Sequence, residues 1–251
     1  MLKKRLIPTI LLSERRLVKT LRFKNPVYVG DPINTVKIFN DKEVDELIVL
    51  DISKSRSNCP PDFDYLGLLA SECFMPLSYG GGITTLDQAS QIFDLGIEKI
   101  VLQSVIFTNP SLVQKIASRY GSQSIVISLD IKKSIFGQYK LFNYQTYRSY
   151  THNINDIISS VVELGAGELI LSSVNKEGTL SGPDLRMIRT FASVTNVPIV
   201  FQGGIASLED VSASILSGAD SLAAGAFFVF YGPHRAVLIS YPEPSTLRSI
   251  L

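Results

Sequence analysis

The sequence is poor in the residues that build metal centres. Its 251 residues include two cysteines, Cys59 and Cys73, and two histidines, His152 and His234. None of the four stands at a spacing typical of a zinc site, so no metal and no cofactor is expected. Two thiols in a chain of this length are typical of reduced cysteines, and we expect a cytoplasmic protein.

An excess of charge of one sign and a long hydrophobic run are also missing. Lys and Arg number 24 and Asp and Glu number 23, which excludes the basic composition of most nucleic-acid binders. No apolar run is long enough to span a bilayer. The apolar residues near the N-terminus form a short run interrupted by Pro8, with no small-residue cleavage site after it, so they predict a buried strand. We therefore expect neither nucleic acid nor a membrane as partner.

Short apolar runs are the main feature that the sequence does contain. They are rich in Ile, Val and Leu without alternation, which is typical of parallel strands buried on both faces. The predicted strands are Arg5–Leu11, Leu47–Ile52, Pro76–Tyr79, Lys99–Gln103, Ser124–Asp130, Leu169–Ser173, Pro198–Gln202 and Ser221–Ala224. Helical patterns lie between them, and strands interleaved with helices indicate an α/β barrel or a doubly wound sheet.

Local signals mark where two of the helices begin or end. The pattern over residues 85–95 stops at Gly96, a predicted helix C-cap. Asn109 and Pro110 are typical of an N-cap and the first helical position of another helix. The polar stretch Phe136–Thr151, with its several tyrosines, predicts a long loop or hairpin after the fifth strand.

An internal repeat favours the barrel over the open sheet. Gly81-Gly82-Ile83 returns as Gly203-Gly204-Ile205, 122 residues later (203 − 81). The match continues without a gap as far as Gly96 and Gly218. We predict a single (βα)₈ barrel over residues 1–251, built from half-barrels of about 1–122 and 123–251.

Glycine-rich turns follow several of the predicted strands. In a (βα)₈ barrel the active site lies at the carboxyl ends of the strands, and glycine lets the backbone approach a phosphate closely. The candidate phosphate-binding residues are Gly81, Gly82, Gln103, Ser104, Gly178, Thr179, Gly203, Gly204 and Gly225. One such turn could serve only to make a tight connection. Two equivalent turns predict two phosphate sites on opposite rims, as an elongated bisphosphate requires.

Charged residues gather at both ends of the strands. Asp51 and Asp130 end the second and fifth strands, where an unpaired acid is costly to bury. Asp130 is the better candidate for a general acid/base and Asp51 the second; a salt bridge with Lys19 or Lys132 is the alternative for Asp130.

At the opposite pole a charged set precedes or starts four strands, and composition alone favours ordinary surface charge for it. The set is Arg5, Glu46, Lys99 and Glu168.

Many motifs along nearly the whole chain resemble those of one enzyme family, the cyclase subunit of imidazole glycerol phosphate synthase. The matching motifs include Lys-Arg-Leu-Ile-Pro near the start, Val18-Lys19, Gly30-Asp31-Pro32, Tyr79-Gly80-Gly81-Gly82-Ile83 and Glu177-Gly178-Thr179. The resemblance adds Lys19 to the expected phosphate-binding residues. It also reverses the preference for surface charge, because the family's ionic gate matches Arg5, Glu46, Lys99 and Glu168.

The resemblance implies a partner and a reaction. Members of the family are (βα)₈ barrels that dock a glutaminase subunit on the N-terminal pole and pass its ammonia through the barrel. At the other end, ammonia attacks a phosphoribulosyl aminoimidazole carboxamide bisphosphate. Cyclisation and cleavage then give imidazole glycerol phosphate and an aminoimidazole carboxamide ribotide. A phosphorylated small molecule is therefore the expected substrate.

This sequence departs from the family at the chemistry. The family uses aspartates at the ends of strands one and five, and the first of them falls on Leu11, which cannot transfer a proton. Three hypotheses stay open. The chain is a diverged paralogue that supplies ammonia for amidating a sugar, giving an acetamidino group, in surface-polysaccharide biosynthesis. Alternatively, it is the histidine-pathway cyclase with Asp130 and Asp51 as a rearranged pair, or a non-catalytic scaffold that activates a glutaminase.

Overall fold

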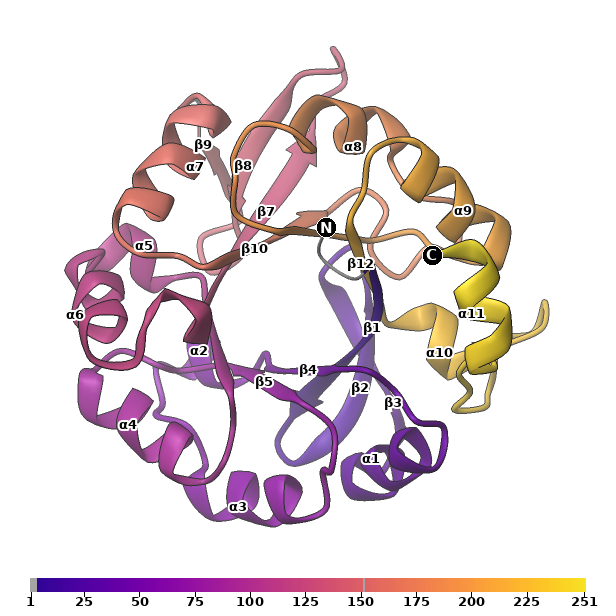
Figure 1. Ribbon diagram of the computed structural model, residues 1–251, viewed down its shortest axis with the longest axis horizontal. Coiled ribbons are helices and arrows are strands. Elements are labelled where there is room, and N and C mark those ends of the chain that lie inside the picture. Colours follow the sequence, from indigo (N-terminus) through magenta and orange to yellow (C-terminus); the bar gives the residue numbers. More distant parts are fainter. Residues whose placement is uncertain (1–3, 151) are drawn as a thin grey trace.

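Eight parallel strands form a closed ring that a ring of helices surrounds (Figure 1). The computed structural model describes residues 4–150 and 152–251. The barrel strands are β1 (Arg5–Ser13), β4 (Leu47–Asp51), β5 (Leu77–Gly80), β6 (Lys99–Leu102), β7 (Ile125–Lys133), β10 (Glu168–Ser173), β11 (Ile199–Gln202) and β12 (Ser221–Ala224). Arg5 pairs with Ser221 where β12 meets β1 and closes the ring. The predicted (βα)₈ barrel is thus confirmed.

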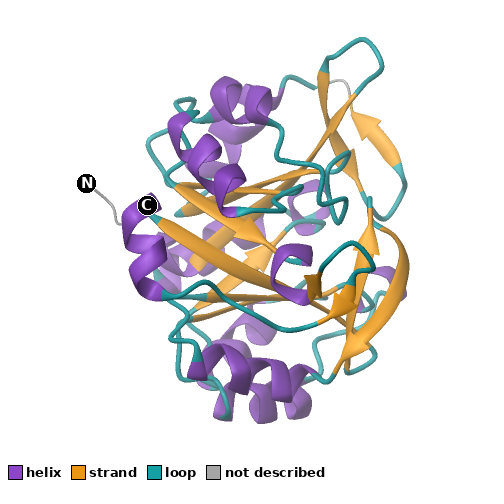
Figure 2. Cartoon of the chain, turned by 90° about the vertical axis from the view of Figure 1, so that its right-hand side faces the viewer, coloured by secondary structure: helices purple, strands orange, loops and turns teal. Residues whose placement is uncertain are grey.

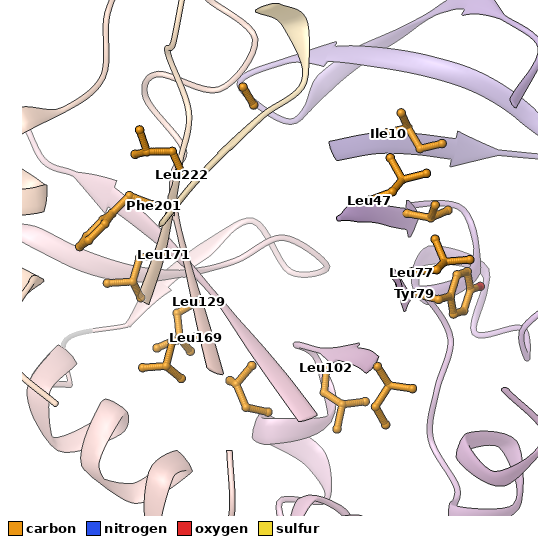
Figure 3. Packing of buried hydrophobic residues seen from close by; sticks show 14 of the residues in the cluster. Ile10, Leu47, Leu77, Tyr79, Leu102, Leu129, Leu169, Leu171, Phe201 and Leu222 are labelled. Carbon is orange, nitrogen blue, oxygen red and sulfur yellow. The ribbon is translucent and has the colours of Figure 1, made fainter. Parts of the chain in front are cut away.

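The strands are apolar throughout because they bury both faces. Outward-facing side chains from all eight strands pack against the helices; Figure 3 labels some of them, from Ile10 on β1 to Leu222 on β12. Inward-facing side chains form a separate apolar layer inside the ring. Its members are Ile7, Ile48, Val101, Val126, Ile170, Val200 and Ala223.

The helices that cover the barrel follow the expected alternation. They are α1 (Pro32–Asp41), α3 (Phe63–Ser71), α4 (Leu86–Asp94), α6 (Ser111–Tyr120), α7 (Ile154–Glu163), α8 (Leu185–Phe191), α9 (Leu208–Leu216) and α11 (Pro244–Ile250). Thr85 begins α4 with a capping box to Gln88. The prediction of Asn109 as the N-cap of α6 was wrong. Pro110 takes that position, and the Asn109 side chain instead accepts a hydrogen bond from the Ser111 hydroxyl.

Two barrel strands continue into antiparallel extensions. β1 pairs with β2 (Arg16–Leu21), which pairs with β3 (Lys24–Gly30). β7 pairs with β8 (Tyr139–Asn143), which pairs with β9 (Arg148–Tyr150), as the expected hairpin. In Figure 2 these strands project from the end of the barrel opposite the C-terminus.

Short elements follow three other strands at the same end. They are α2 (Lys54–Ser57) after β4, α5 (Val105–Thr108) after β6 and α10 (Ala226–Val229) after β12. The β13–β14 hairpin (Phe230–Tyr231 and Ala236–Val237) comes next along the chain. Both Gly-Gly turns therefore follow the third strand of a set of four, and a short helix follows the fourth. The exact half-barrel boundaries stay a prediction.

The chain returns to its first strand before it ends. The hydroxyl of Tyr241, which lies just before α11, donates a 2.8 Å hydrogen bond to the Leu6 carbonyl on β1. Both residues are buried. This contact fixes the last segment across the closing strands of the barrel. No helix in the described part of the chain is long and apolar enough to cross a membrane.

Candidate active site

A pocket of about 900 Å³, including its open mouth, lies at the carboxyl ends of the barrel strands. It contains both acid/base candidates and part of the predicted phosphate-binding set. The sequence-predicted residues that line it are Asp51, Asp130, Gly81, Gly82, Gln103 and Ser104. The remaining predicted residues, Lys19, Gly178, Thr179, Gly203, Gly204 and Gly225, lie outside its lining.

Asp130 is the buried acid of this pocket. Alternation along β7 turns Ser128 and Asp130 toward the pocket, and the Gln103 side-chain amide donates a hydrogen bond to the Asp130 carboxyl. Burial raises the pKa of Asp130 to about 7; the bond from Gln103 acts against this rise, and the charge of Glu177 adds to it. A carboxyl that titrates near neutral pH can both give and take a proton.

Neither lysine considered in the sequence forms a salt bridge with Asp130 in the described structure. Lys19 Nζ lies 3.9 Å from a Glu177 oxygen, and Lys132 Nζ lies over the Phe142 ring. The alternative prediction of an ion-paired Asp130 is therefore wrong. Its charged form lacks a neutralising cation, which is why burial dominates its pKa.

Asp51 lines the same pocket, but its carboxylate already accepts hydrogen bonds from the start of α2. Its Oδ1 accepts hydrogen bonds from the Ser53 amide at 3.0 Å, the Ser53 hydroxyl at 2.6 Å and the Lys54 amide at 3.3 Å. These bonds hold the start of α2 against the end of β4. Asp51 thus has a clear structural role at the pocket edge.

Leu11 occupies the matching place on the first strand. Ile7 faces the interior layer and Leu11 faces the pocket, so β1 alternates inward as β7 does with Val126 and Asp130. Leu11 is 7% exposed. Where β7 presents a carboxyl to the pocket, β1 presents an apolar side chain.

Gly225, which follows β12, is associated with a buried lysine. A Cβ atom at Gly225 would lie only 2.2 Å from Lys19 Nζ, so glycine makes room for the ammonium beside the start of α10. Burial lowers the pKa of Lys19, and Glu177 partly restores it. Lys19 is thereby held at the second of the two predicted phosphate positions.

Glu177 is a pocket residue that the sequence did not single out. Its carboxylate accepts hydrogen bonds from the Thr20 hydroxyl at 2.9 Å and the Phe23 amide at 3.0 Å. It therefore ties the β2–β3 hairpin to the segment after β10. The only sequence signal was its place in the Glu-Gly-Thr motif.

Aromatic side chains from two loops meet at the pocket mouth, together with an arginine from α2. The rings of Phe23 and Tyr144 meet edge to face with centroids 5.9 Å apart. Arg56 lies over the Tyr144 ring and donates a 3.2 Å hydrogen bond to the Tyr147 hydroxyl. We call Phe23, Arg56, Tyr144 and Tyr147 the aromatic roof. The tyrosine-rich stretch was recognised only as a loop or hairpin.

Four side chains form a charged ring at the opposite, N-terminal pole. Arg5 donates a 2.6 Å hydrogen bond to Glu46 and another bond to Glu168. Lys99 Nζ lies 2.9 Å from each of the same two glutamates. Burial lowers the pKa values of Arg5 and Lys99, but Glu168 and Glu46 together raise them more, so the net direction is upward. The predicted gate residues are therefore in mutual contact.

The charged ring and the pocket are separated by the apolar layer. Glu46, Glu168 and Ser78 border a space inside the barrel together with residues of that layer. This space is too narrow to hold a water molecule. Above it, two buried polar atoms, Thr9 Oγ1 and Gln202 Oε1, have no hydrogen-bond partner among the described residues. Gln202 lines the pocket and is free to bind a ligand there.

Residues 5–233 match the family model described as histidine biosynthesis protein. The chain belongs to this family. No group of three or more His, Cys, Asp or Glu side chains suited to a metal ion occurs in the described part of this histidine biosynthesis family member.

Full-length relatives place the chain among the HisF-like members. It is 44% identical to a Leptospira interrogans protein provisionally named imidazole glycerol phosphate synthase subunit HisF, over 97% of this chain and 96% of that one. It is 43% identical to the Pseudomonas aeruginosa protein provisionally named subunit hisF2, over 98% and 99%. It is 33% identical to subunit HisF of Exiguobacterium sibiricum, over 98% and 95%.

Proposed function

We propose that this chain is the ammonia-accepting, cyclase-type subunit of a glutaminase complex, diverged to supply ammonia for sugar amidation. The product would be an acetamidino group in surface-polysaccharide biosynthesis, a cytoplasmic step. The observation that carries the proposal is the contrast between Leu11 on β1 and Asp130 on β7, which both face the pocket. The pocket retains one acid/base residue where the cyclase reaction uses two, while the charged ring keeps all four members.

The charged ring supports the ammonia route. Its members lie at the pole where a glutaminase docks in the family, and the layer beyond it is apolar, as suits a small neutral molecule. The space there is too narrow for a water-sized molecule, so the passage of ammonia requires the charged ring and this layer to move apart. Phe74, in the loop that enters β5 at this pole, is 84% exposed. An exposed aromatic side chain of this kind is a typical anchor of an interface, and we assign it to the glutaminase contact.

The pocket supports a phosphorylated acceptor and one proton transfer. The turns at Gly81 and Gly82, with Ser104 nearby, would take one phosphate, and Lys19 with the Gly203, Gly204 and Gly225 turns the other. Asp130 would remove or return a proton as ammonia adds. Without a second acid on β1, the ring closure and cleavage of the cyclase reaction lack one proton-transfer group, which usually costs about 10²–10⁴-fold in rate.

The relatives also favour a diverged copy. Identity is 43% to proteins provisionally named hisF2 and hisF3 in Pseudomonas aeruginosa and Vibrio vulnificus. It is 33% to proteins named HisF without a number, from Exiguobacterium sibiricum and Streptococcus sanguinis. The unnumbered Leptospira interrogans HisF, also provisionally named, is equally similar at 44%, so the chain is more similar to the provisionally named members than to those named HisF outright.

Complementation tests the proposal directly. A histidine auxotroph that lacks the cyclase should not grow when this chain is expressed, and the purified chain should not cyclise the bisphosphate substrate with added ammonia. Growth, or turnover at ordinary cyclase rates, would establish the histidine-pathway cyclase instead. If Asp130→Asn left every pathway output unchanged, the glutaminase-activating scaffold would replace both.

A further inference from the structure

The near-neutral total charge hides basic segments in the two antiparallel extensions. Residues 14–30, which form the first antiparallel extension, contain five basic residues and one acidic residue. Residues 131–150, around the second extension, contain four basic residues and no acidic one. At the opposite pole, the loops that enter the strands expose acids such as Glu43, Glu98 and Asp220. We call the end that carries the extensions the C-terminal rim. Its two antiparallel extensions are basic, whereas the helices that begin at the same end carry acids such as Asp64, Asp87 and Glu209 in their first turns.

The tip of the β7–β8 hairpin exposes two adjacent large apolar side chains. Ile135 is 93% and Phe136 is 84% exposed. The turn is internally bonded, with the Ser134 amide donating to the Gln138 carbonyl at 2.8 Å and the Gly137 amide to the Ser134 carbonyl at 3.0 Å. The fold therefore holds these apolar groups out into solvent on an ordered turn. Exposed apolar groups in this position mark interaction sites.

The stem of the same hairpin concentrates positive charge. Lys132 stands directly opposite Lys140 in the β7–β8 ladder, an arrangement in which like charges repel. Lys133 is the next residue along β7. Within residues 4–150 and 152–251, none of these three lysines forms a salt bridge. An anionic partner would relieve the repulsion that the fold itself leaves in place.

Other projections around the ring repeat this combination. The β2–β3 hairpin exposes Val27 (59%) and Tyr28 (62%), with Arg22 and Lys24 exposed beside its turn. The β13–β14 hairpin exposes Tyr231, Val237 and Leu238. The three hairpins start from different strands of the barrel, and Figure 1 shows them at separate places around the ring. Three hairpins at separate places can contact a flat surface at the same time more readily than they can enter a single cleft of a partner.

The overall composition predicted no membrane partner, but total charge and long apolar runs do not report on a single exposed hairpin, and we propose that the C-terminal rim docks on an anionic lipid surface. Ile135 and Phe136 insert among the headgroups, and Lys132, Lys133 and Lys140 lie against lipid phosphates. Apolar tips with cations a few residues behind them are the arrangement that binds such surfaces. Steering of a phosphorylated substrate would account for the lysines but not for the exposed Ile and Phe. The proposal is independent of the proposed function, because it concerns the rim and not the reaction in the pocket.

Sedimentation with vesicles tests the proposal on the full chain. Vesicles of phosphatidylethanolamine and phosphatidylglycerol should bind it, and vesicles of phosphatidylcholine should not. Binding should weaken as salt rises, because screening shortens the reach of the lysines. Ile135→Ser with Phe136→Ser should weaken binding about tenfold or more. Lys132→Gln and Lys140→Gln should each weaken it about fivefold.

A matched variant at the other pole provides the control. Leu216 ends α9 and is 86% exposed, so Leu216→Ser removes comparable apolar surface away from the rim and should leave binding unchanged. Thermal unfolding of every variant should match the parent chain, since Lys132, Ile135, Phe136 and Leu216 are exposed and Lys140 is half-buried without a salt bridge among the described residues. Absence of binding to the anionic vesicles, or full binding by the Ile135→Ser, Phe136→Ser chain, would overturn the lipid proposal. In the first case an acidic protein surface would become the partner to seek.

Discussion

The charged ring and the pocket both bury carboxylates, but only the carboxylates of the ring are in contact with cations. In the ring, Glu46 and Glu168 each contact two cations, Arg5 and Lys99. In the pocket, Asp130 has only the neutral Gln103 amide as a partner. The ring surrounds its acids with cations, whereas burial in the pocket raises the pKa of Asp130 to about 7. Compensated charge suits a fixed framework, and uncompensated charge suits proton transfer.

The sharpest way to test this difference is to remove the pocket acid. Asp130→Asn keeps the size of the side chain and its bond to Gln103 but cannot exchange a proton. We expect ammonia-dependent product formation to fall about 10²–10⁴-fold. The matched control is Asp94→Asn on the exposed end of α4, which should leave the rate unchanged. Equal rates for both variants would remove Asp130 from the chemistry.

The pH dependence of stability should separate the two sites. Because the pKa of Asp130 is raised from an ordinary value of 3.8 to about 7 in the folded chain, the folded state binds its proton more tightly than the unfolded state. Protonation of Asp130 therefore makes its full contribution to the free energy of unfolding below about pH 4. This contribution is lost as pH rises to about 7. The loss is up to about 4 kcal/mol. Urea unfolding at a series of pH values should show this decline, and Asp130→Asn should remove it.

Opening the charged ring should cost stability without that pH signature. Glu168→Gln leaves Arg5 and Lys99 sharing a single carboxylate. Removing one partner of a buried ion pair usually costs about 3–5 kcal/mol, and the partial exposure of Arg5 and Lys99 should place the result near about 3 kcal/mol. The control is Glu163→Gln at the exposed end of α7. Indistinguishable urea midpoints for the two variants would show that the ring contributes nothing to stability.

Adding a second acid should bring the pocket closer to the cyclase pattern. Leu11→Asp places a carboxyl on β1 in the place that Asp130 takes on β7. Burying it should destabilise the fold by about 2 kcal/mol, and two nearby carboxyls should titrate as a coupled pair. We expect cyclisation of the bisphosphate with ammonia to become measurable, and Leu11→Asn to remain inactive. Equal activity of the two variants would argue that position 11 does not transfer a proton.

The smallest effect should come from Glu177, which connects the segment after β10 to the β2–β3 hairpin. Glu177→Gln keeps the length of the side chain but removes the charge that contacts Thr20, Phe23 and Lys19. The contact with Lys19 is long, at 3.9 Å, so its loss costs less than that of a close buried ion pair. The charge-assisted bonds to Thr20 and Phe23 then set the expected local loosening at about 1 kcal/mol. Hydrogen exchange of the Phe23 amide should speed up several-fold. Glu209→Gln, an exposed change on α9, should not alter it, and unchanged exchange in Glu177→Gln would contradict this connection.

The barrel could be predicted from the sequence because its causes are local. Parallel strands buried on both faces read as apolar runs, and the eight runs match the eight strands closely. The glycine turns likewise have a short-range cause, the tight connection from strand to helix. The boundary errors are also local: β7 runs on to Lys133, beyond the predicted end at Asp130, because it pairs with β8.

The site could be predicted only in part, because its contacts join distant residues. Glu177 and Thr20 are 157 residues apart in the chain, and no spacing rule connects them. Arg56 and Tyr147 are 91 apart. Asp51 illustrates a different limit, since an acid at a strand end gives the same pattern whether it transfers protons or caps α2. The geometry around each acid, and not its position, separates these roles.

The hydrogen bond from Tyr241 to Leu6 has a consequence for how the protein is made. β1 leaves the ribosome first, but its partner β12 lies 216 residues later at the Arg5–Ser221 contact. Until then one edge of β1 has unpaired backbone groups, the kind of edge that recruits other chains. Tyr241 follows β12 and completes the seam. Nascent chains arrested before residue 241 should therefore aggregate or occupy chaperones, whereas chains released just after it should close.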